Sequence, residues 1–418
     1  MSSTSSSEDY SDSHESDSSD TESEQETNFT GMTINNKYLL IAKIGKGAFS
    51  TVWLSYNINN KVFNAIKIQD ADEFDSGMNE VDTLLKINKT DCKHLNKMLD
   101  NFVFESIDGE HVCMVFELLA GSVFDLIRTG KYSNGLPLNV VKNIIRQTLI
   151  AISSLNNDIN FLHSDIKPEN LLIGGISYRV QNIIDQFNNL NNSKTNKQSK
   201  KNKKNKKNKQ NETNLADIIS KINIPENPKN NDKNKNKDTT QILIDEKYYL
   251  NSIDIRLSDF GGCYEISEVM NNEIQTRYYM APEIILDHPF NENCDVWSIG
   301  CMTYELLTGK ILFDPGKDKR FNRDRCHLYD IQSSLGLIPT KVLDKSKKRN
   351  MFIRKNGLIK GTDHVTYRPL STMIINKLGD STEENELASL LDFLYMTLEI
   401  DPDKRPIAKD CLKHKWLN

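Results

Sequence analysis

The chain has 418 residues, of which 37% are hydrophobic and 27% are charged, so most of it can form a buried core. The formal net charge of -5 averages two opposed segments and therefore excludes no class of partner by itself. Residues 1–30 are rich in Ser, Asp and Glu and contain no Lys or Arg, whereas residues 194–209 are nearly all Lys and Asn.

The seven cysteines are scattered and form no C-x-x-C pair, which argues against a structural zinc site and favours reduced thiols. The chain has no basic-then-apolar start and no run of about 18 apolar residues, so neither a secretory signal nor a membrane span is expected. These features predict a soluble intracellular protein of the cytoplasm, the nucleus or both.

Residues 1–33 hold too few apolar side chains to offset the entropy of ordering, so we expect a disordered acidic tail. Beyond it, β-forming residues alternate or cluster in three successive stretches, which predict antiparallel strands at 38–47, 50–57 and 61–69. Helical spacing follows at 78–87, and a strongly apolar strand is predicted at 111–119.

Two features of this first region suit phosphate chemistry. Gly45, Gly47 and Val52 form the pattern G-x-G-x-x-S-x-V, in which a glycine hairpin lets backbone N–H groups approach phosphates. Such hairpins are common, so the signal is weak alone. Lys67 lies in an apolar strand, where phosphate oxygens and the carboxylate of Glu80 would justify its burial.

The stretch "FLHSDIKPENLLIGG" follows a predicted helix at 138–157. In it, Asp165 can accept a hydroxyl proton, Lys167 can neutralise a transferring phosphoryl group and Asn170 can hold a metal ion. Asp259 in "LSDFGG" adds a second oxygen ligand of the kind that Mg²⁺ requires. A chance occurrence of this loop pattern is not expected.

Further along the chain, three polar residues suggest contacts that hold the structure together. Glu283 in "TRYYMAPE" and Arg405 in "DPDKRP" can form a buried ion pair that fixes a substrate-side loop. Asp295, at the start of a predicted apolar helix, can accept hydrogen bonds from backbone N–H groups of the 163–170 loop.

Residues 181–245 are dominated by Asn, Lys, Ile and Gln, which predicts a disordered low-complexity insertion with limits at 176–253. Two short pieces in it, 215–222 and 240–250, are candidates for transient helix or strand. The Lys/Asn run is interpreted first as a solvated spacer and second as a nuclear-localisation or partner-docking signal. Nucleic-acid binding is third, because no aromatic residues interleave the lysines for stacking.

The order G-x-G, A-I-K, H-x-D-x-K-x-x-N, D-F-G, A-P-E, D-x-W-S-x-G and a late Arg resembles the eukaryotic protein kinases. The resemblance implies an α+β, two-lobed fold with a β-rich N-lobe at 34–119, a helical C-lobe at 120–418, and ATP with Mg²⁺ between them. It places a gatekeeper at Phe116 and the adenine-binding backbone at Glu117 and Leu119.

The resemblance also assigns site residues. The catalytic set is Asp165, Lys167, Lys67 and Glu80, and the metal ligands are Asn170 and Asp259. The substrate-side set is Thr276, Arg277, Glu283 and Arg405. The nucleotide-binding set is Ile44, Gly45, Lys46, Gly47, Ala48, Phe49, Ser50, Val52, Ala65, Lys67, Phe116, Glu117, Leu119, Asn170 and Leu172.

Four segments are similar to the SR-protein kinases, a family of serine/threonine kinases that splits its kinase domain with a variable spacer. They are "HSDIKPEN", "CMVFELL", "GKILFDPGKDKRFNRDRCHLYDIQSSLGLIP" and "MFIRKNGLIK". This chain has room for such a spacer, because its two metal-ligand candidates, Asn170 and Asp259, are 89 positions apart. The segment after "FDP" departs from the family's acidic groove, since it carries Lys317, Lys319, Arg320, Arg323 and Arg325 beside Asp318 and Asp324. Arg/Ser-repeat substrates are therefore in doubt.

The sequence thus predicts a monomeric serine/threonine protein kinase that binds neither membranes nor nucleic acid. A pseudokinase scaffold is disfavoured because Lys67, Asp165, Asn170 and Asp259 are all present, and a small-molecule kinase is disfavoured by the A-P-E segment. Ser164 occupies the position where many kinases carry an arginine that binds a phosphorylated loop, so we expect a constitutively active enzyme.

Overall fold

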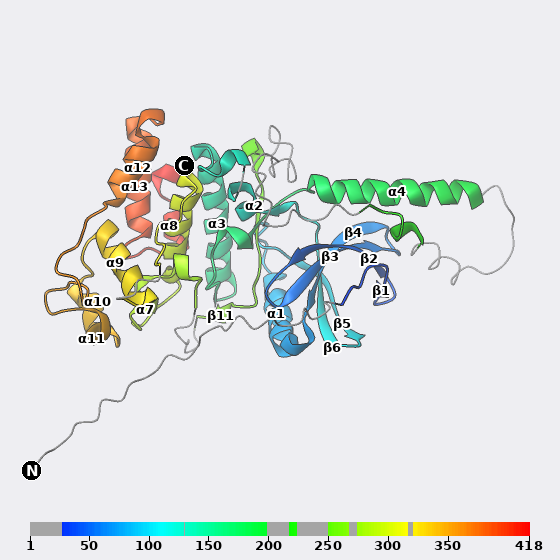
Figure 1. The fold of residues 1–418 in the computed structure, drawn as a ribbon, viewed down its shortest axis with the longest axis horizontal. Coiled ribbons are helices and arrows are strands. Elements are labelled where there is room, and N and C mark those ends of the chain that lie inside the picture. Colours follow the sequence, from blue (N-terminus) through cyan, green and yellow to red (C-terminus); the bar gives the residue numbers. More distant parts are fainter. Residues whose placement is uncertain (1–26, 129, 199–216, 224–249, 267–273, 317–320) are drawn as a thin grey trace, which may run out of the picture.

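The computed structural model describes residues 27–128, 130–198, 217–223, 250–266, 274–316 and 321–418. A β-rich lobe and a helical lobe lie side by side, and the chain passes from one to the other after β6 (Figure 1). The predicted α+β, two-lobed fold is confirmed. The limits of the two lobes at residues 34, 119 and 120 stay predictions.

The N-lobe is built on one antiparallel sheet in the order β1-β2-β3-β4-β6-β5. The three strands predicted between residues 38 and 69 are confirmed. The strands are β1 (Thr33–Ile34), β2 (Tyr38–Lys46), β3 (Ser50–Asn57), β4 (Val62–Gln69), β5 (Met98–Ser106) and β6 (Gly109–Phe116).

Side chains of the strands point alternately to the two faces of this sheet, and each face packs in a hydrophobic cluster. On one face, Val112 and Met114 of β6 pack in one cluster with Val81 and Leu84 of helix α1 (Phe74–Ile87). On the other face, Cys113 packs in a separate aromatic-rich cluster. The predicted helix and the predicted strand are therefore both present.

The end of the acidic tail is ordered. Phe29 is buried and its ring lies 5.9 Å from Trp53, 5.5 Å from Phe104 and 5.7 Å from His111. The prediction of disorder up to residue 33 is therefore wrong for residues 27–33, because one aromatic side chain anchors an otherwise polar segment. Residues 1–26 lie outside the described residues.

The C-lobe is centred on helices α3 (Leu138–Asp158) and α8 (Asn293–Thr308), which confirm two predicted helices. Every residue of α8 is buried, and the helix ends at Gly309, whose φ of +70° suits glycine. The other helices are α2 (Val123–Ile127), α7 (Pro282–Ile285), α9 (Arg323–Leu335), α10 (Thr340–Lys345), α11 (Arg349–Phe352), α12 (Leu370–Leu378), α13 (Glu384–Thr397) and α14 (Ala408–Cys411).

Short strands in the C-lobe hold the loops that face the N-lobe. They form a β10-β9-β7 sheet and a β11-β8 pair. Their bounds are β7 (Gly121–Ser122), β8 (Phe161–Leu162), β9 (Leu171–Ile173), β10 (Ile255–Leu257) and β11 (Tyr264–Glu265). In the described part of the chain, no helix is both long and apolar enough to cross a bilayer.

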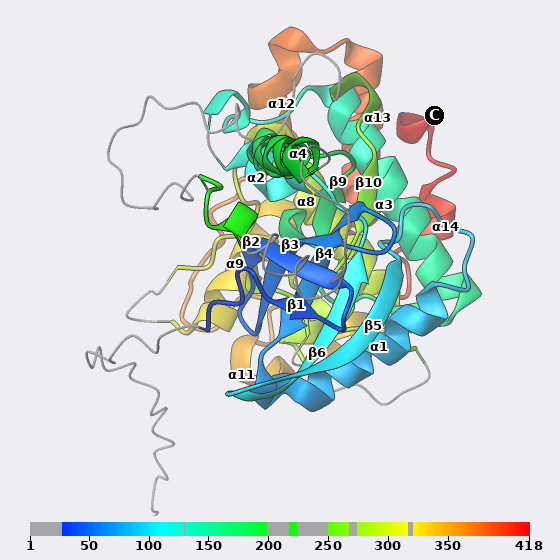
Figure 2. The same ribbon diagram turned by 90° about the vertical axis from the view of Figure 1, so that its right-hand side faces the viewer.

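The insertion leaves the C-lobe after β9 and returns at β10, and its first part is a long helix. Helix α4 (Tyr178–Gln198) lies along the N-lobe sheet, and Figure 2 shows it nearly end-on over β2 and β3. Residues 217–222 are also described, with Ile218 and Ile219 buried. The prediction of disorder is therefore wrong for α4, because apolar side chains at helical spacing lie among its Asn residues. The first candidate piece, 215–222, is helical at residues 217–219. The second predicted piece, 240–250, lies almost wholly outside the described residues.

We expect Phe29→Ala to lower the free energy of unfolding by up to about 3 kcal/mol, because it leaves a cavity among three aromatic rings. Met32→Ala is the control, since Met32 is 42% exposed. Chemical denaturation of both variants measures the difference, and equal stabilities would contradict the anchoring role.

Candidate active site

The catalytic loop, residues 163–170, is held by one buried carboxylate. Asp295 at the start of α8 is completely buried, and its two oxygens accept hydrogen bonds from the backbone N–H of His163 (2.9 Å) and Ser164 (3.0 Å). This is the contact predicted from the sequence. A buried carboxylate is tolerated only with such donors, so the loop and the helix are mutually fixed.

Asp165 lies at the centre of a polar cluster. Its Oδ2 accepts a hydrogen bond from Lys167 Nζ at 2.6 Å, and its Oδ1 accepts one from Thr276 Oγ1 at 2.6 Å. Burial raises the pKa of Asp165, but the donors on Lys167 and Thr276 outweigh burial and hold the pKa below its usual value. The carboxylate is thus ionised at neutral pH and can accept a hydrogen bond from an incoming hydroxyl.

Asn170 and Asp259 are brought together by the β9-β10 pairing. Asn170 Nδ2 donates to the carbonyl of Asp165 at 2.9 Å, which leaves the side-chain Oδ1 as the atom suited to a cation. The backbone N–H of Ser258 donates to the Asn170 carbonyl at 2.9 Å, so Asp259 follows directly beside Asn170. The Asp259 side chain is 51% exposed.

This pair of oxygen donors fits Mg²⁺. Magnesium ions are often held by one or two protein oxygens together with water and substrate phosphates. Among the described residues, no group of three or more His, Cys, Asp or Glu side chains is arranged to hold a metal ion.

Lys67 on β4 joins the two lobes. Its Nζ lies 2.7 and 2.9 Å from the two carboxylate oxygens of Glu80 on α1, and 3.3 Å from Oδ1 of Asp259. Burial lowers the pKa of Lys67, but the carboxylates of Glu80 and Asp259 outweigh burial and hold the pKa above its usual value. The ammonium group therefore stays charged in the cleft and can contact phosphate oxygens.

The glycine hairpin between β2 and β3 lies across from this lysine. Val52 pairs with Gly45 on one side and with Lys67 on the other. A Cβ added at Gly45 would lie 3.3 Å from the Val52 Cβ, and the Gly47 N–H donates to the Ser50 carbonyl at 2.8 Å. A side chain at the first glycine would therefore require Val52 to shift by a few tenths of an ångström.

The other predicted nucleotide-binding residues surround this hairpin and the lobe junction. The tip residues Lys46, Ala48 and Phe49 are exposed, Ser50 and Phe116 are buried, and Glu117 is exposed at the junction. The partly buried members are Ile44, Val52, Ala65, Leu119 and Leu172.

Glu283 and Arg405 form the predicted buried ion pair. The guanidinium donates to both carboxylate oxygens at 2.6 and 3.0 Å, and neither side chain is exposed. Arg405 also donates to the carbonyls of Glu399 and Asn293. These contacts give four hydrogen bonds for the five N–H groups of the guanidinium, which offset the cost of burying the cation.

The substrate-side loop has further contacts that sequence reasoning missed. Gln275, at φ +69°, donates from Nε2 to the Cys294 carbonyl at 2.8 Å and accepts from the Ala281 N–H at 2.9 Å. Tyr279 donates to Glu305 at 2.6 Å. A positive φ at glutamine and a tyrosine–glutamate pair 26 residues apart leave no local signal in the sequence.

Ser164 is at φ +68°, and its hydroxyl donates to the carbonyl of Gly262 at 2.5 Å. The serine therefore ties the catalytic loop directly to the segment after Asp259. Arg277, next to Thr276, donates to Asp324 at the start of α9 at 2.5 Å. Residues 317–320, part of the basic segment singled out in the sequence, lie outside the described residues.

His327 on α9 is completely buried. Its ring centroid is 5.5 Å from that of Phe313, and neither ring nitrogen has a hydrogen-bond partner among the described residues. Burial, together with the nearby cations Arg277 and Arg323, lowers the pKa of His327 to about 3. The imidazole is therefore neutral in the folded protein.

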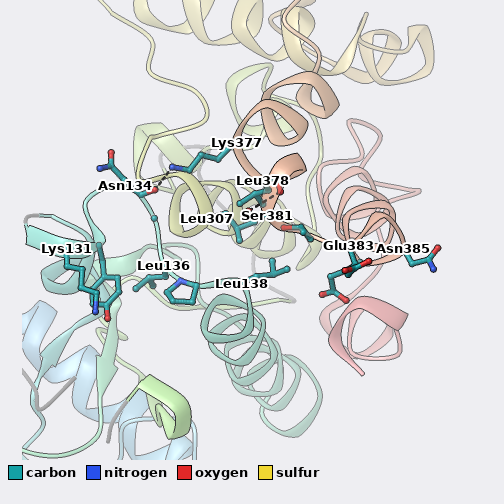
Figure 3. Close-up of a pocket in the computed structure, with 15 residues that line it drawn as sticks. Lys131, Asn134, Leu136, Leu138, Leu307, Lys377, Leu378, Ser381, Glu383 and Asn385 are labelled. Carbon is teal, nitrogen blue, oxygen red and sulfur yellow. Dashed lines mark hydrogen bonds between the residues drawn. The ribbon is translucent and has the colours of Figure 1, made fainter. Parts of the chain in front are cut away.

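A separate groove of about 900 Å³ lies in the C-lobe, between the α2–α3 connection and the region joining α12 to α13 (Figure 3). Lys377 donates across it to the Asn134 carbonyl at 2.6 Å. None of the predicted site residues lines it, so it is distinct from the cleft that holds Asp165 and Lys67.

Comparisons with known proteins agree with this geometry. The model of the protein kinase domain family matches residues 38–186 and 233–417 and leaves part of the insertion unmatched. A putative serine/threonine-protein kinase, L205, of Acanthamoeba polyphaga mimivirus is 33% identical over 94% of this chain and 90% of its own length. The serine/threonine-protein kinase SRPK of Physarum polycephalum is 28% identical (93% and 87% covered), and SRSF protein kinase 3 of Homo sapiens is 24% identical (93% and 87%).

We expect His327 to make the protein less stable in acid. Below pH 6.5, His327 binds a proton in the unfolded chain, whereas in the folded protein its imidazole stays neutral down to about pH 3. The free energy of unfolding therefore falls as the pH falls through this window. The loss attributable to His327 approaches about 1.4 kcal/mol per pH unit below its unfolded pKa. Denaturation of wild type and His327→Gln between about pH 7 and about pH 4 measures it.

The exposed His364 supplies the control for this measurement. His364→Gln should keep the wild-type slope of stability against pH, whereas His327→Gln should flatten it. Parallel slopes for all three proteins would contradict the role given to His327.

Proposed function

The chain belongs to the protein kinase family, and from that premise we propose that its cleft binds ATP with Mg²⁺ and transfers the γ-phosphoryl group to Ser or Thr hydroxyls of protein substrates. It is a serine/threonine kinase of the SR-protein kinase type, as its relatives' names indicate. The observation that carries the proposal is the Glu80–Lys67–Asp259 chain of contacts, which links N-lobe and C-lobe groups in one charged cluster.

Each group in the cleft has a task suited to its chemistry. We propose that Asp165 orients the acceptor hydroxyl and takes up its proton, while Lys167 offsets negative charge on the group in transfer. Lys67, held by Glu80, fixes phosphate oxygens. Asn170 and Asp259 supply the two protein ligands for Mg²⁺, which would neutralise phosphate charge when bound.

Two other functions are less well supported. A scaffold without catalysis would not need Lys67, Glu80 and Asp259 in mutual contact, nor Asp165 hydrogen-bonded on both oxygens. A kinase for small molecules is less well supported, because the buried Glu283–Arg405 pair fixes the end of the 274–283 loop, whose Thr276 is hydrogen-bonded to Asp165.

The basic segment at the start of α9 bears on the substrate. Asp324 is paired with Arg277, so its charge is already compensated, while Arg323 and Arg325 lie beside it on the same helix. Like charges reduce affinity for arginine-rich peptides. We therefore propose that Arg/Ser repeats are poor substrates compared with peptides of lower positive charge. We also retain as proposals that the enzyme acts as a monomer and does not bind nucleic acid.

We expect Asp165→Asn and Asp259→Asn each to lower kcat by about 10²–10⁴-fold, because each removes a group that acts on the reacting atoms or their counter-ion. Asp363→Asn is the matched control, since that carboxylate is 95% exposed. Transfer of labelled phosphate from ATP with Mg²⁺ to acidic, neutral and Arg/Ser peptides gives the rates. Equal incorporation by wild type and Asp165→Asn would overturn the catalytic assignment.

The contact made by Ser164 leads to an expectation about regulation by phosphorylation. Because Ser164 reaches the Gly262 carbonyl directly and provides no cation, we infer that residues 259–266 need no phosphate for their placement. Phosphatase-treated enzyme, shown by mass spectrometry to carry no phosphate there, should keep its kcat within about twofold of untreated enzyme. A loss of activity that returns on rephosphorylation would contradict this.

A further inference from the structure

The N-terminal tail (residues 1–26) is joined to the fold at a fixed point. Phe29 is buried among three aromatic rings, and the N–H of Gly31 donates to the Leu40 carbonyl of β2 at 2.8 Å. The Leu40 N–H donates in turn to the Met32 carbonyl at 2.8 Å. Residues 29–32 are thereby held on the N-lobe sheet, and the tail is tethered to that lobe at residue 27.

This tether point is connected to the glycine hairpin by a short series of contacts. Thr27 donates to the carboxylate of Asp108, which precedes β6. The next residue, Gly109, lies close to Ala71, since a Cβ added to the glycine would be 3.1 Å from the Ala71 Cβ. The backbone N–H just before Ala71 donates to the Phe49 carbonyl at the hairpin tip at 3.0 Å. The tail therefore leaves the fold on a part of the N-lobe that contacts the hairpin over the proposed phosphate site.

The tail is rich in acceptor hydroxyls and is long enough to bring them to the cleft. It contains eleven Ser, two Thr and nine Asp or Glu, with no Lys or Arg. An extended chain spans about 3.3 Å per residue, so Ser11, sixteen residues before Thr27, can lie up to about 50 Å from it. A compact chain of about 300–400 residues has a radius of gyration of only about 20 Å. Tethered groups reach effective concentrations in the mM range, which favours reaction within one molecule.

Two arginines beside the substrate-side loop favour an acidic sequence. The ion pair of Arg277 with Asp324 joins this loop, whose Thr276 contacts the carboxylate of the catalytic loop, to the start of α9. Arg323 and Arg325 flank that aspartate, and neither forms a salt bridge within the described part of the chain. Their charges can therefore attract the carboxylates of an incoming segment, whereas an arginine-rich segment is repelled.

We propose that the N-terminal tail is a substrate of the active site of its own molecule, and that Ser and Thr residues within 2–23 are the phosphorylation sites. This inference rests on the proposed kinase function. The acceptor hydroxyl oxygen forms a bond to the γ-phosphorus of ATP, the bond from that phosphorus to the ADP oxygen breaks, and Asp165 takes up the hydroxyl proton. Arg323 and Arg325 bind carboxylates that neighbour the acceptor.

The first test uses full-length enzyme that has been dephosphorylated and repurified. It is incubated with MgATP, and peptide mass spectrometry locates the phosphate over time. We expect phosphate on several hydroxyls of residues 2–23, with a rate constant that stays within about twofold between about 0.1 and about 10 µM enzyme, because a reaction within one molecule is independent of concentration. A rate constant that rises in proportion to concentration, or phosphate confined to other segments, would overturn the proposal.

A mixing experiment separates transfer within a molecule from transfer between molecules. Asp165→Asn alone should gain no tail phosphate, which excludes a contaminating kinase. When it is mixed with wild type at about 1 µM each, the wild-type tail should be labelled and the variant tail should not. Equal labelling of both tails would contradict the proposal.

The role of the two arginines is tested by charge reversal. Arg323→Glu with Arg325→Glu should lower the ratio of the tail rate to the rate on a neutral peptide by about tenfold. Lys409→Glu with Lys413→Glu is the control, because it makes the same change in charge at exposed residues on and beside α14. The control should keep the wild-type ratio. An equal fall in both double variants would contradict the role given to Arg323 and Arg325.

Failure of this inference and failure of the proposed function are distinguishable. If wild type phosphorylates neither its tail nor a neutral peptide, the kinase function itself is wrong. If wild type phosphorylates a neutral peptide and a free peptide of residues 2–26 but leaves its own tail unmodified, only the inference is wrong. Phosphate on the tail of wild type that is absent from Asp165→Asn supports both.

Discussion

The carboxylate of Asp295 is the constraint on which the cleft depends. Its two oxygens hold consecutive N–H groups of the catalytic loop, and the side chain is completely buried inside the lobe. If the loop moved away, the buried carboxylate of Asp295 would lose these hydrogen-bond donors, which is energetically costly. The same helix, α8, receives Gln275 from the substrate-side loop and Arg405 from the C-terminal region. One fully buried helix thus orders segments that are far apart in sequence.

Contacts that join chemically complementary residues were predictable from the sequence. Lys67 with Glu80 was inferred because a charge in an apolar strand needs a partner, and Glu283 with Arg405 was predicted as a buried pair that fixes the substrate-side loop. The structure contains both pairs. The three strands of residues 38–69 and helix α3 followed from periodicity. Proximity of Asn170 to Asp259 across 89 positions followed only from the resemblance, since no local pattern encodes a pairing at that distance.

Contacts that depend on tertiary context were not predictable. The positive φ of Gln275 and the carbonyl reached by Ser164 are set by the surrounding loops. Phe29 is one aromatic residue in a polar segment, so the average composition of the segment did not indicate that its ring is buried. Helix α4 was missed for the same reason: the many Asn and Lys residues made the stretch polar as a whole, while its few apolar residues kept a helical spacing.

The position of α4 along the chain has a consequence for synthesis. The ribosome makes the N-lobe first, and α4 follows β9 directly, whereas the partner strand β10 and helix α8 come later. With residues 199–418 still to be made, translation at about 5–20 residues per second leaves on the order of ten to forty seconds before the C-lobe can close. During that interval α4 is already available to cover the apolar face formed by Leu39, Ile41 and Leu54, which would otherwise be open to aggregation on the nascent chain.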